Sequence, residues 1–141
     1  MGTRCIVVLK DNDDVNLVVY GHWDGYPSGE YGVLAELELA LPLAWEFPRF
    51  EADEFGAALV AAWKRQPGNV RLFGDFKGWE YTPGDIEWVY IIDGSGSEEP
   101  IVTVYAWHPA CGEGYAPFPE PAWTGKFSEA KVAGLNWQNG K

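Results

Sequence analysis

YGHWDGYPSGE, residues 20–30, is the stretch from which the rest of the chain can be interpreted. A β-branched run leads into it, and apolar residues at helical spacing lead out of it. It carries one His, one Asp, one Ser, three aromatic residues and three glycines. A strand that passes through a glycine-rich turn into a helix presents backbone N–H groups and the positive end of the helix dipole. We therefore expect a binding corner here.

The residues before this stretch predict a β-hairpin. Two runs rich in β-branched residues, 3–9 and 15–20, flank the turn-forming cluster DNDD at residues 11–14. Antiparallel pairing about that turn places residue 4 near residue 21. We therefore expect Arg4 to lie beside the residues that end the second run, which are Tyr20, His22 and Asp24.

The rest of the chain adds helices and a second hairpin. Apolar residues recur at helical spacing over 31–41, where Pro42 should stop or kink the helix, and over 51–66. The other predicted elements are an apolar loop over the core at 43–50, a short strand at 70–73, a hairpin of 86–93 and 100–108, and a short helix at 128–133. The economical arrangement is an α+β fold: an antiparallel sheet built from two β-hairpins, with two helices packed on one face.

Length and hydropathy set the broad class of the protein. A chain of 141 residues predicts one α+β domain over residues 1–141, with an irregular segment rich in Pro and Gly from about residue 109. No apolar run is long enough for a membrane helix, and the first residues lack the apolar core and cleavage site of a signal peptide. We therefore expect a cytoplasmic protein with no membrane partner. Whether it forms a homo-oligomer stays open.

The charge and the aromatic content of the chain limit the kinds of partner that we expect. Asp and Glu number 21 against 10 Lys and Arg, a net charge of −11 at pH 7. This argues against direct binding to nucleic acid, which relies on Lys and Arg at phosphates. It permits the opposite role, in which an acidic surface occupies the nucleic-acid groove of a partner protein. Of the eight Trp residues, we expect most in the core and a minority at a ligand site or interface.

Catalytic and metal-binding patterns are weak. Cys5 and Cys111 are too few for a disulfide framework and are expected to pack as small hydrophobic groups. His108 lies three residues from Cys111 across a proline, a spacing that seldom allows a Cys–His nucleophile. Thr3 would become an N-terminal nucleophile only after a further cleavage. The acidic turn at 11–14 lacks the Gly and Glu of a calcium loop. We therefore expect no catalytic residues, no metal and no cofactor, and we favour a binding protein over an enzyme.

Two short segments carry a resemblance to a family. Gly2-Thr3-Arg4, together with the motif from Tyr20 to Pro27, is similar to small proteins of tailed phages and prophage-bearing bacteria. Those proteins open with a Gly/Ala-Thr-Arg strand and continue into a second strand that ends in Tyr-x-His/Gln-Trp-Asp-Gly-Tyr, followed by a helix. The similarity covers about the first quarter of the chain. It implies a phage context, in the cytoplasm of a bacterial host, and no particular chemistry.

The binding corner has two interpretations. In the first, Arg4 and the glycine-rich turn hold an anionic or nucleotide-like ligand, an aromatic ring stacks on it, and Asp24 accepts hydrogen bonds from sugar hydroxyls. In the second, Arg4 and Asp24 form a structural ion pair that orders the turn. The candidate ligand- or partner-binding residues are Arg4, Tyr20, His22, Trp23, Asp24, Tyr26 and Ser28.

Three hypotheses about function follow. The first is a non-enzymatic, phage-type accessory protein that antagonises an antiviral defence system of the host by binding, through sequestration of a small nucleotide-derived signal at the aromatic corner. The second is an acidic mimic of nucleic acid that inhibits a host defence protein or a CRISPR-type effector. The third, and weakest, is a small hydrolase or nucleotidase.

Overall fold

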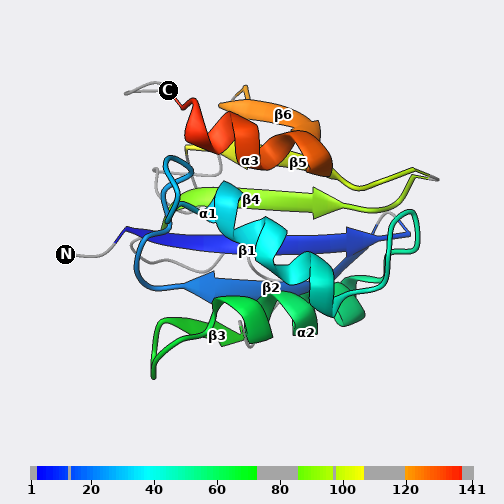
Figure 1. Cartoon of the computed structure of the whole chain (residues 1–141), viewed down its shortest axis with the longest axis horizontal. Helices are drawn as coiled ribbons and strands as arrows, with labels where there is room; N and C mark the ends of the chain where they lie inside the picture. The colour runs from blue at the N-terminus through cyan, green and yellow to red at the C-terminus, as the bar shows by residue number, and fades with distance from the viewer. Residues whose placement is uncertain (1–2, 13, 73–85, 97, 107–119, 138–141) are drawn as a thin grey trace, which may run out of the picture.

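The computed structural model describes residues 3–12, 14–72, 86–96, 98–106 and 120–137, which form an α+β fold with a six-stranded sheet (Figure 1). Its centre is the predicted first hairpin, made of β1 (Arg4–Asp11) and β2 (Asp14–Gly21). These strands pair antiparallel, with Cys5 opposite Gly21 and Asp11 opposite Asp14. The first hairpin is therefore confirmed, and an irregularity between Leu9 and Lys10 shifts its register by one residue from the pairing of residue 4 with residue 21 that the turn predicts.

The sheet is mixed, and it contains more than two hairpins. The strand order is β3-β2-β1-β4-β5-β6. The predicted second hairpin is confirmed as the antiparallel pair β4 (Ile86–Asp93) and β5 (Ile101–Tyr105). The prediction of a purely antiparallel sheet is wrong, because β4 lies parallel to β1 and joins the two hairpins. The edge strands are β3 (Val70–Leu72), which was predicted, and β6 (Trp123–Lys126), which was not.

The helices lie on one face of the sheet, as predicted (Figure 1). The first predicted helix divides into α1 (Val33–Glu36) and the 3-10 helix η1 (Leu37–Leu43), which contains Pro42 instead of ending before it. The second is α2 (Ala52–Trp63), and the helix predicted in the tail is α3 (Phe127–Leu135). The described helices on this face therefore include α3 in addition to the two that were expected there. Helix α3 packs next to α1.

The strands of the first hairpin are buried on both faces. Cys5, Val7 and Leu9 lie in the core between the sheet and the helices. The alternate residues Ile6 and Val8 lie in a second buried cluster on the opposite face. A strand buried on both faces is expected to be almost continuously apolar, as the sequence of β1 is. The loop after η1 packs on the core through Phe47 and Phe50, as predicted for residues 43–50.

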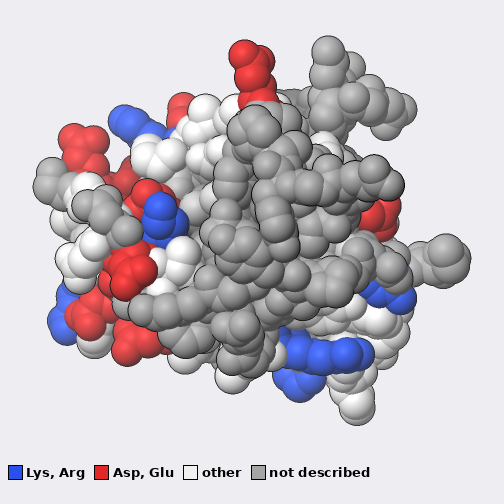
Figure 2. Space-filling model, turned by 180° about the vertical axis from the view of Figure 1, so that it is seen from behind, with Lys and Arg blue, Asp and Glu red and all other residues white. Residues whose placement is uncertain are grey.

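The pairing pattern gives the sheet two chemically different ends. One end gathers the start of β1, the end of β2 and the turn at residues 22–26; we call it the aromatic end. The other gathers the end of β1, the starts of β2 and β5 and the end of β4; we call it the acidic end. The carboxylates of the acidic end, counting the start of α2, are those of Asp11, Asp14, Glu51, Asp53, Glu54, Asp93, Glu98 and Glu99. From behind the sheet, most of the red side chains gather toward this end with some blue ones among them, and further blue side chains lie at the lower right (Figure 2).

Candidate functional site

A cluster of polar and aromatic side chains occupies the face opposite the helices at the aromatic end. Tyr20 belongs to the buried cluster of that face, and it pairs directly with Arg71 of β3. Its hydroxyl group lies 2.8 Å from Nδ1 of His22, and the guanidinium carbon of Arg71 lies 5.5 Å from the centre of its ring. The register places Arg4 beside His22, so the predicted neighbourhood of Arg4, Tyr20 and His22 is present.

The electrostatics of this cluster are set by two guanidinium groups. The pKa of His22 lies below its usual value, mainly because of desolvation and further because of the positive charges of Arg4 and Arg71. His22 is therefore neutral at pH 7. Arg71 was missed by the sequence analysis, which predicted its strand but could not assign the strand a partner.

The turn after β2 is held firmly against β1. Asp24 has a φ of +55°, a left-handed conformation that Asp tolerates in turns. Gly25 donates its N–H to the carbonyl oxygen of Thr3 (2.8 Å), and its own carbonyl accepts from the hydroxyl group of buried Tyr90 (2.6 Å). A Cβ at position 25 would lie 2.6 Å from the carbonyl oxygen of Thr3, so only glycine fits. The Asp-Gly pair is thus a structural part of the corner.

Trp23 and Asp24 border a small pocket on the other side of this turn. The pocket has a volume of about 130 Å³. The hydroxyl group of Tyr26 donates to Oδ1 of Asp24 (3.1 Å) at its margin, and the Trp23 indole meets the ring of His22 edge-on at 4.8 Å. The other lining residues come from α1, from the end of α2 and from the loops beside them: Tyr31, Glu36, Trp63, Arg65, Gln66 and Asn69.

An ion pair between buried Glu36 and half-exposed Arg65 forms one wall of the pocket. Glu36 is only 5% exposed, and its two carboxylate oxygens accept hydrogen bonds from Nη1 and Nη2 of Arg65 at 3.0 and 2.8 Å. This two-bond geometry is the strong form of an Arg–carboxylate pair. The sequence analysis missed both residues, although a Glu between the apolar residues Leu34 and Leu37 of a helical pattern was an available signal.

The candidate residues therefore lie in three places, with Tyr26 beside Asp24, to which its hydroxyl group donates. Arg4, Tyr20 and His22 lie on the face opposite the helices, whereas Trp23 and Asp24 border the pocket. Ser28 belongs to a third place, the loop whose next residue, Gly29, donates its N–H to the carbonyl of Gly134 on α3. The expected open helix N-terminus is not seen at Val33, whose N–H is bonded to the carbonyl of Tyr26 (2.9 Å).

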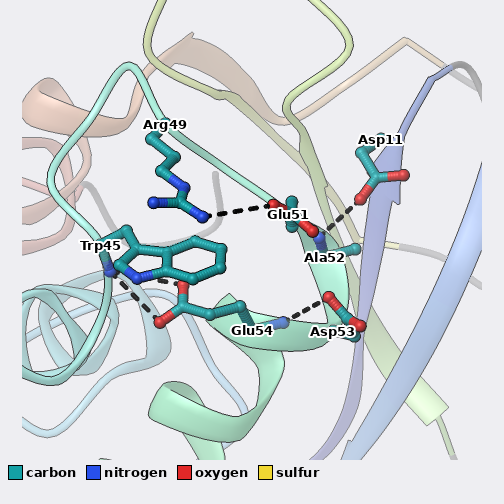
Figure 3. A network of polar contacts seen from close by, with 7 residues as sticks. All are labelled: Asp11, Trp45, Arg49, Glu51, Ala52, Asp53 and Glu54. Atoms are coloured by element: carbon teal, nitrogen blue, oxygen red, sulfur yellow. Dashed lines mark hydrogen bonds and ion pairs between the residues drawn. The ribbon is translucent and has the colours of Figure 1, made fainter.

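At the acidic end, carboxylates bind backbone N–H groups (Figure 3). Oδ2 of Asp11 accepts from the N–H of Ala52 (2.6 Å), so a side chain of β1 caps the start of α2. Glu54 accepts from the N–H of Trp45 at 3.2 and 3.3 Å, and the guanidinium group of Arg49 stacks over the Trp45 indole at 3.3 Å. These carboxylates have a structural role and are held in fixed positions.

The carboxylate of Glu99 likewise binds a backbone N–H group, at the start of α3. It accepts from the N–H of Ser128 at 2.7 Å. The hydrogen bonds to Ser128 lower the pKa of Glu99, with a smaller contribution from the charge of Lys126. The carboxylate therefore stays charged in moderately acidic solution.

The described residues offer little for catalysis. Burial raises the pKa of the Cys5 thiol far above its ordinary value, so Cys5 is the packed, unreactive thiol that was expected. His108 and Cys111 lie outside the described residues. Within the described part of the chain, no three His, Cys, Asp or Glu side chains are grouped as metal ligands. None of its helices has the length and apolar character needed to cross a bilayer.

Comparison of the chain with protein-family models, with curated proteins and with solved structures found no match. Function therefore has to be argued from the chemistry of the chain's own surfaces. Those surfaces are the acidic end, the cluster around His22, and the pocket beside Trp23.

Proposed function

We propose that this protein is a non-enzymatic binding protein that antagonises a partner protein, in the setting of a phage-type accessory protein acting on a host defence system. It binds a basic, nucleic-acid-binding surface of that partner through its acidic end. The single observation that carries the proposal is the gathering of carboxylates at one end of the sheet, in a chain whose net charge is −11. The phage setting rests on the resemblance at Gly2-Thr3-Arg4 and Tyr20–Pro27.

The hydrogen bonds of the acidic end support this role. Asp11, Glu54 and Glu99 are each anchored to a backbone N–H, so their charges do not have to be ordered when a partner arrives. Preorganised groups lose less entropy on binding than mobile ones. A negative surface also speeds the encounter with a positive partner, an effect that salt screens.

The test is an inhibition assay with matched charge variants. DNA cleavage by a panel of purified defence nucleases, including CRISPR-type effectors, is measured with increasing amounts of the protein. The acidic-end variant is Glu51→Lys with Glu98→Lys, two exposed residues of that end, of which Glu51 is drawn in Figure 3. The control is Glu30→Lys with Glu87→Lys, two exposed residues near the aromatic end that change the net charge equally.

We expect the wild type to inhibit at least one nuclease. The acidic-end variant should weaken that inhibition about tenfold or more, and the control about twofold or less, because local charge and not total charge determines the contact. Raising the salt concentration should also weaken the inhibition of the nuclease. Equal losses in the two variants, or no inhibition of any nuclease, would contradict the proposal.

A second candidate function, binding of a nucleotide-like signal, is supported by a different observation. Arg4 and Arg71 both place positive charge beside His22, on a protein that is otherwise acidic. Such a pair of guanidinium groups suits the phosphate of a nucleotide-like signal, with Tyr20 nearby as an aromatic surface. The pocket beside Trp23 is smaller than the roughly 300–1,000 Å³ that usual ligand sites provide, so it could not enclose a nucleotide.

Thermal melting with a panel of cyclic nucleotides tests this candidate. A ligand that binds the native state must raise the melting temperature, and Arg71→Gln should remove that rise. A panel without any rise excludes sequestration. Turnover of a nucleotide that binds would favour the hydrolase or nucleotidase alternative instead.

A further inference from the structure

We propose that the pocket beside Trp23 binds the head group of a small organic cation, a methylated ammonium group. The inference does not depend on the proposed function, because the pocket lies at the aromatic end and the partner surface at the acidic end. Three aromatic side chains, Trp23, Tyr31 and Trp63, contribute to its lining. Recognition of quaternary ammonium groups commonly uses aromatic surroundings of this composition.

The charges around the pocket favour a cation. Its charged lining groups are Asp24, Glu36 and Arg65. Arg65 is bound by both of its terminal nitrogens to Glu36, so these two charges compensate each other. The carboxylate of Asp24 remains as the net charge, and a cation in the pocket would neutralise it. His22, which contacts Trp23 from outside, adds no opposing charge because it is neutral at pH 7.

The accessibility of the aromatic residues also suits a ligand. Trp63 is 4% exposed and forms a fixed floor, since its ring packs against Gly21. Trp23 is 38% exposed and Tyr31 is 65% exposed, so both can contact a molecule that enters from solvent. A volume of about 130 Å³ admits one head group and leaves the remainder of its molecule outside. The source of the head group is therefore either a free cation such as choline or a trimethyllysine side chain.

The experiment is an NMR titration of the tryptophan indole N–H signals. The probes are choline, a short peptide with one trimethyllysine, and 3,3-dimethylbutan-1-ol, which has the shape of choline without its charge. We expect choline or the peptide to shift the Trp23 signal, with dissociation constants in the millimolar range or tighter, and the neutral alcohol to have little effect. Binding of choline alone indicates a free cation as the ligand, whereas binding of the peptide indicates a modified side chain.

Two variants and one matched control make the test specific. Trp23→Leu and Asp24→Asn should each weaken binding about fivefold or more, because they remove an aromatic surface and a charge. Trp45→Leu is the control: Trp45 is also 38% exposed, but it lies in the network of the acidic end (Figure 3). The spectra of each variant report whether it is folded. Equal binding of the alcohol and choline, equal effects of the Trp23 and Trp45 variants, or no shift up to about 50 mM choline would overturn the proposal.

Discussion

The acidic end and the aromatic end of the sheet use carboxylates in different ways. At the acidic end, several carboxylates bind backbone N–H groups, as Asp11 does at Ala52 and Glu99 does at Ser128, while two others lie within ion-pair distance of Lys10 and Arg49. At the aromatic end, they bind other side chains: Glu36 pairs with Arg65, and Asp24 accepts from Tyr26. The first arrangement fixes the starts of helices. The second borders a pocket.

This difference separates carboxylates that also hold a helix start from the carboxylate of Asp24, which holds none. A carboxylate that caps a helix stabilises the fold, typically by about 1 kcal/mol, while its charge still faces solvent. A carboxylate at the rim of a pocket has no such effect on helix stability. Substitution of a capping carboxylate such as Asp11 should therefore lower stability, whereas substitution of the rim carboxylate Asp24 should lower binding.

Loss of the buried ion pair should have the largest effect. Arg65→Met leaves the carboxylate of Glu36, which is 5% exposed, without its partner. We expect a loss of about 3 kcal/mol in the free energy of unfolding, near the lower end of the range for broken buried pairs because Arg65 itself is half exposed. Urea denaturation measures it. The double variant Glu36→Gln with Arg65→Met should recover part of the loss; no recovery would show that packing and not charge was responsible.

A methyl group in the turn should have the next largest effect. Gly25→Ala would place a Cβ 2.6 Å from the backbone oxygen of Thr3, which cannot move without shifting β1. We expect a loss of about 2 kcal/mol, typical of overpacking. Gly96→Ala is the control, because no atom lies within 4 Å of the Cβ it would add. Equal melting temperatures of the two variants would contradict the tight attachment of the turn to β1.

The titration of His22 should respond to Arg71. The pKa of His22 lies below 6.5 in the folded protein, so this residue's contribution to stability is present above pH 6.5 and decreases as the pH falls through its folded pKa. Arg71→Gln removes one of the positive charges responsible, and the pKa should rise toward 6.5. NMR titration of the imidazole protons measures the change. An unchanged pKa in the variant would mean that Arg71 does not act on His22.

Much of the fold follows from local sequence patterns, and the pairing of distant elements does not. Runs rich in β-branched residues and the turn at 11–14 specify the first hairpin, but not the irregularity between Leu9 and Lys10 that shifts its register by one residue. The parallel pairing of β1 with β4 depends on segments about 80 residues apart, and no local pattern selects that partner. β6 was missed because WTGK is short and contains a glycine, both unfavourable signals for a strand.

The same limit applies to the candidate site. Arg4, Tyr20 and His22 could be grouped because one hairpin brings them together. Arg71, Glu36 and Arg65 could not, since their partners come from other elements; Glu36 and Arg65 are 29 residues apart. Trp23 and Asp24 of the motif line the pocket and Tyr26 is not among its lining residues, while the opposite wall depends on how α1 and α2 pack.

The most direct test of the contrast between the two ends is a paired measurement on Asp11 and Asp24. Asp11→Ala removes the cap of α2, and Asp24→Asn removes a charge while retaining a residue that tolerates the left-handed turn. We expect urea denaturation to show a loss of about 1 kcal/mol for Asp11→Ala and less than about 0.5 kcal/mol for Asp24→Asn. In choline titrations, only Asp24→Asn should lose affinity. A stability loss for Asp24→Asn as large as that for Asp11→Ala, with binding unchanged, would contradict the account and make the aromatic end a structural corner.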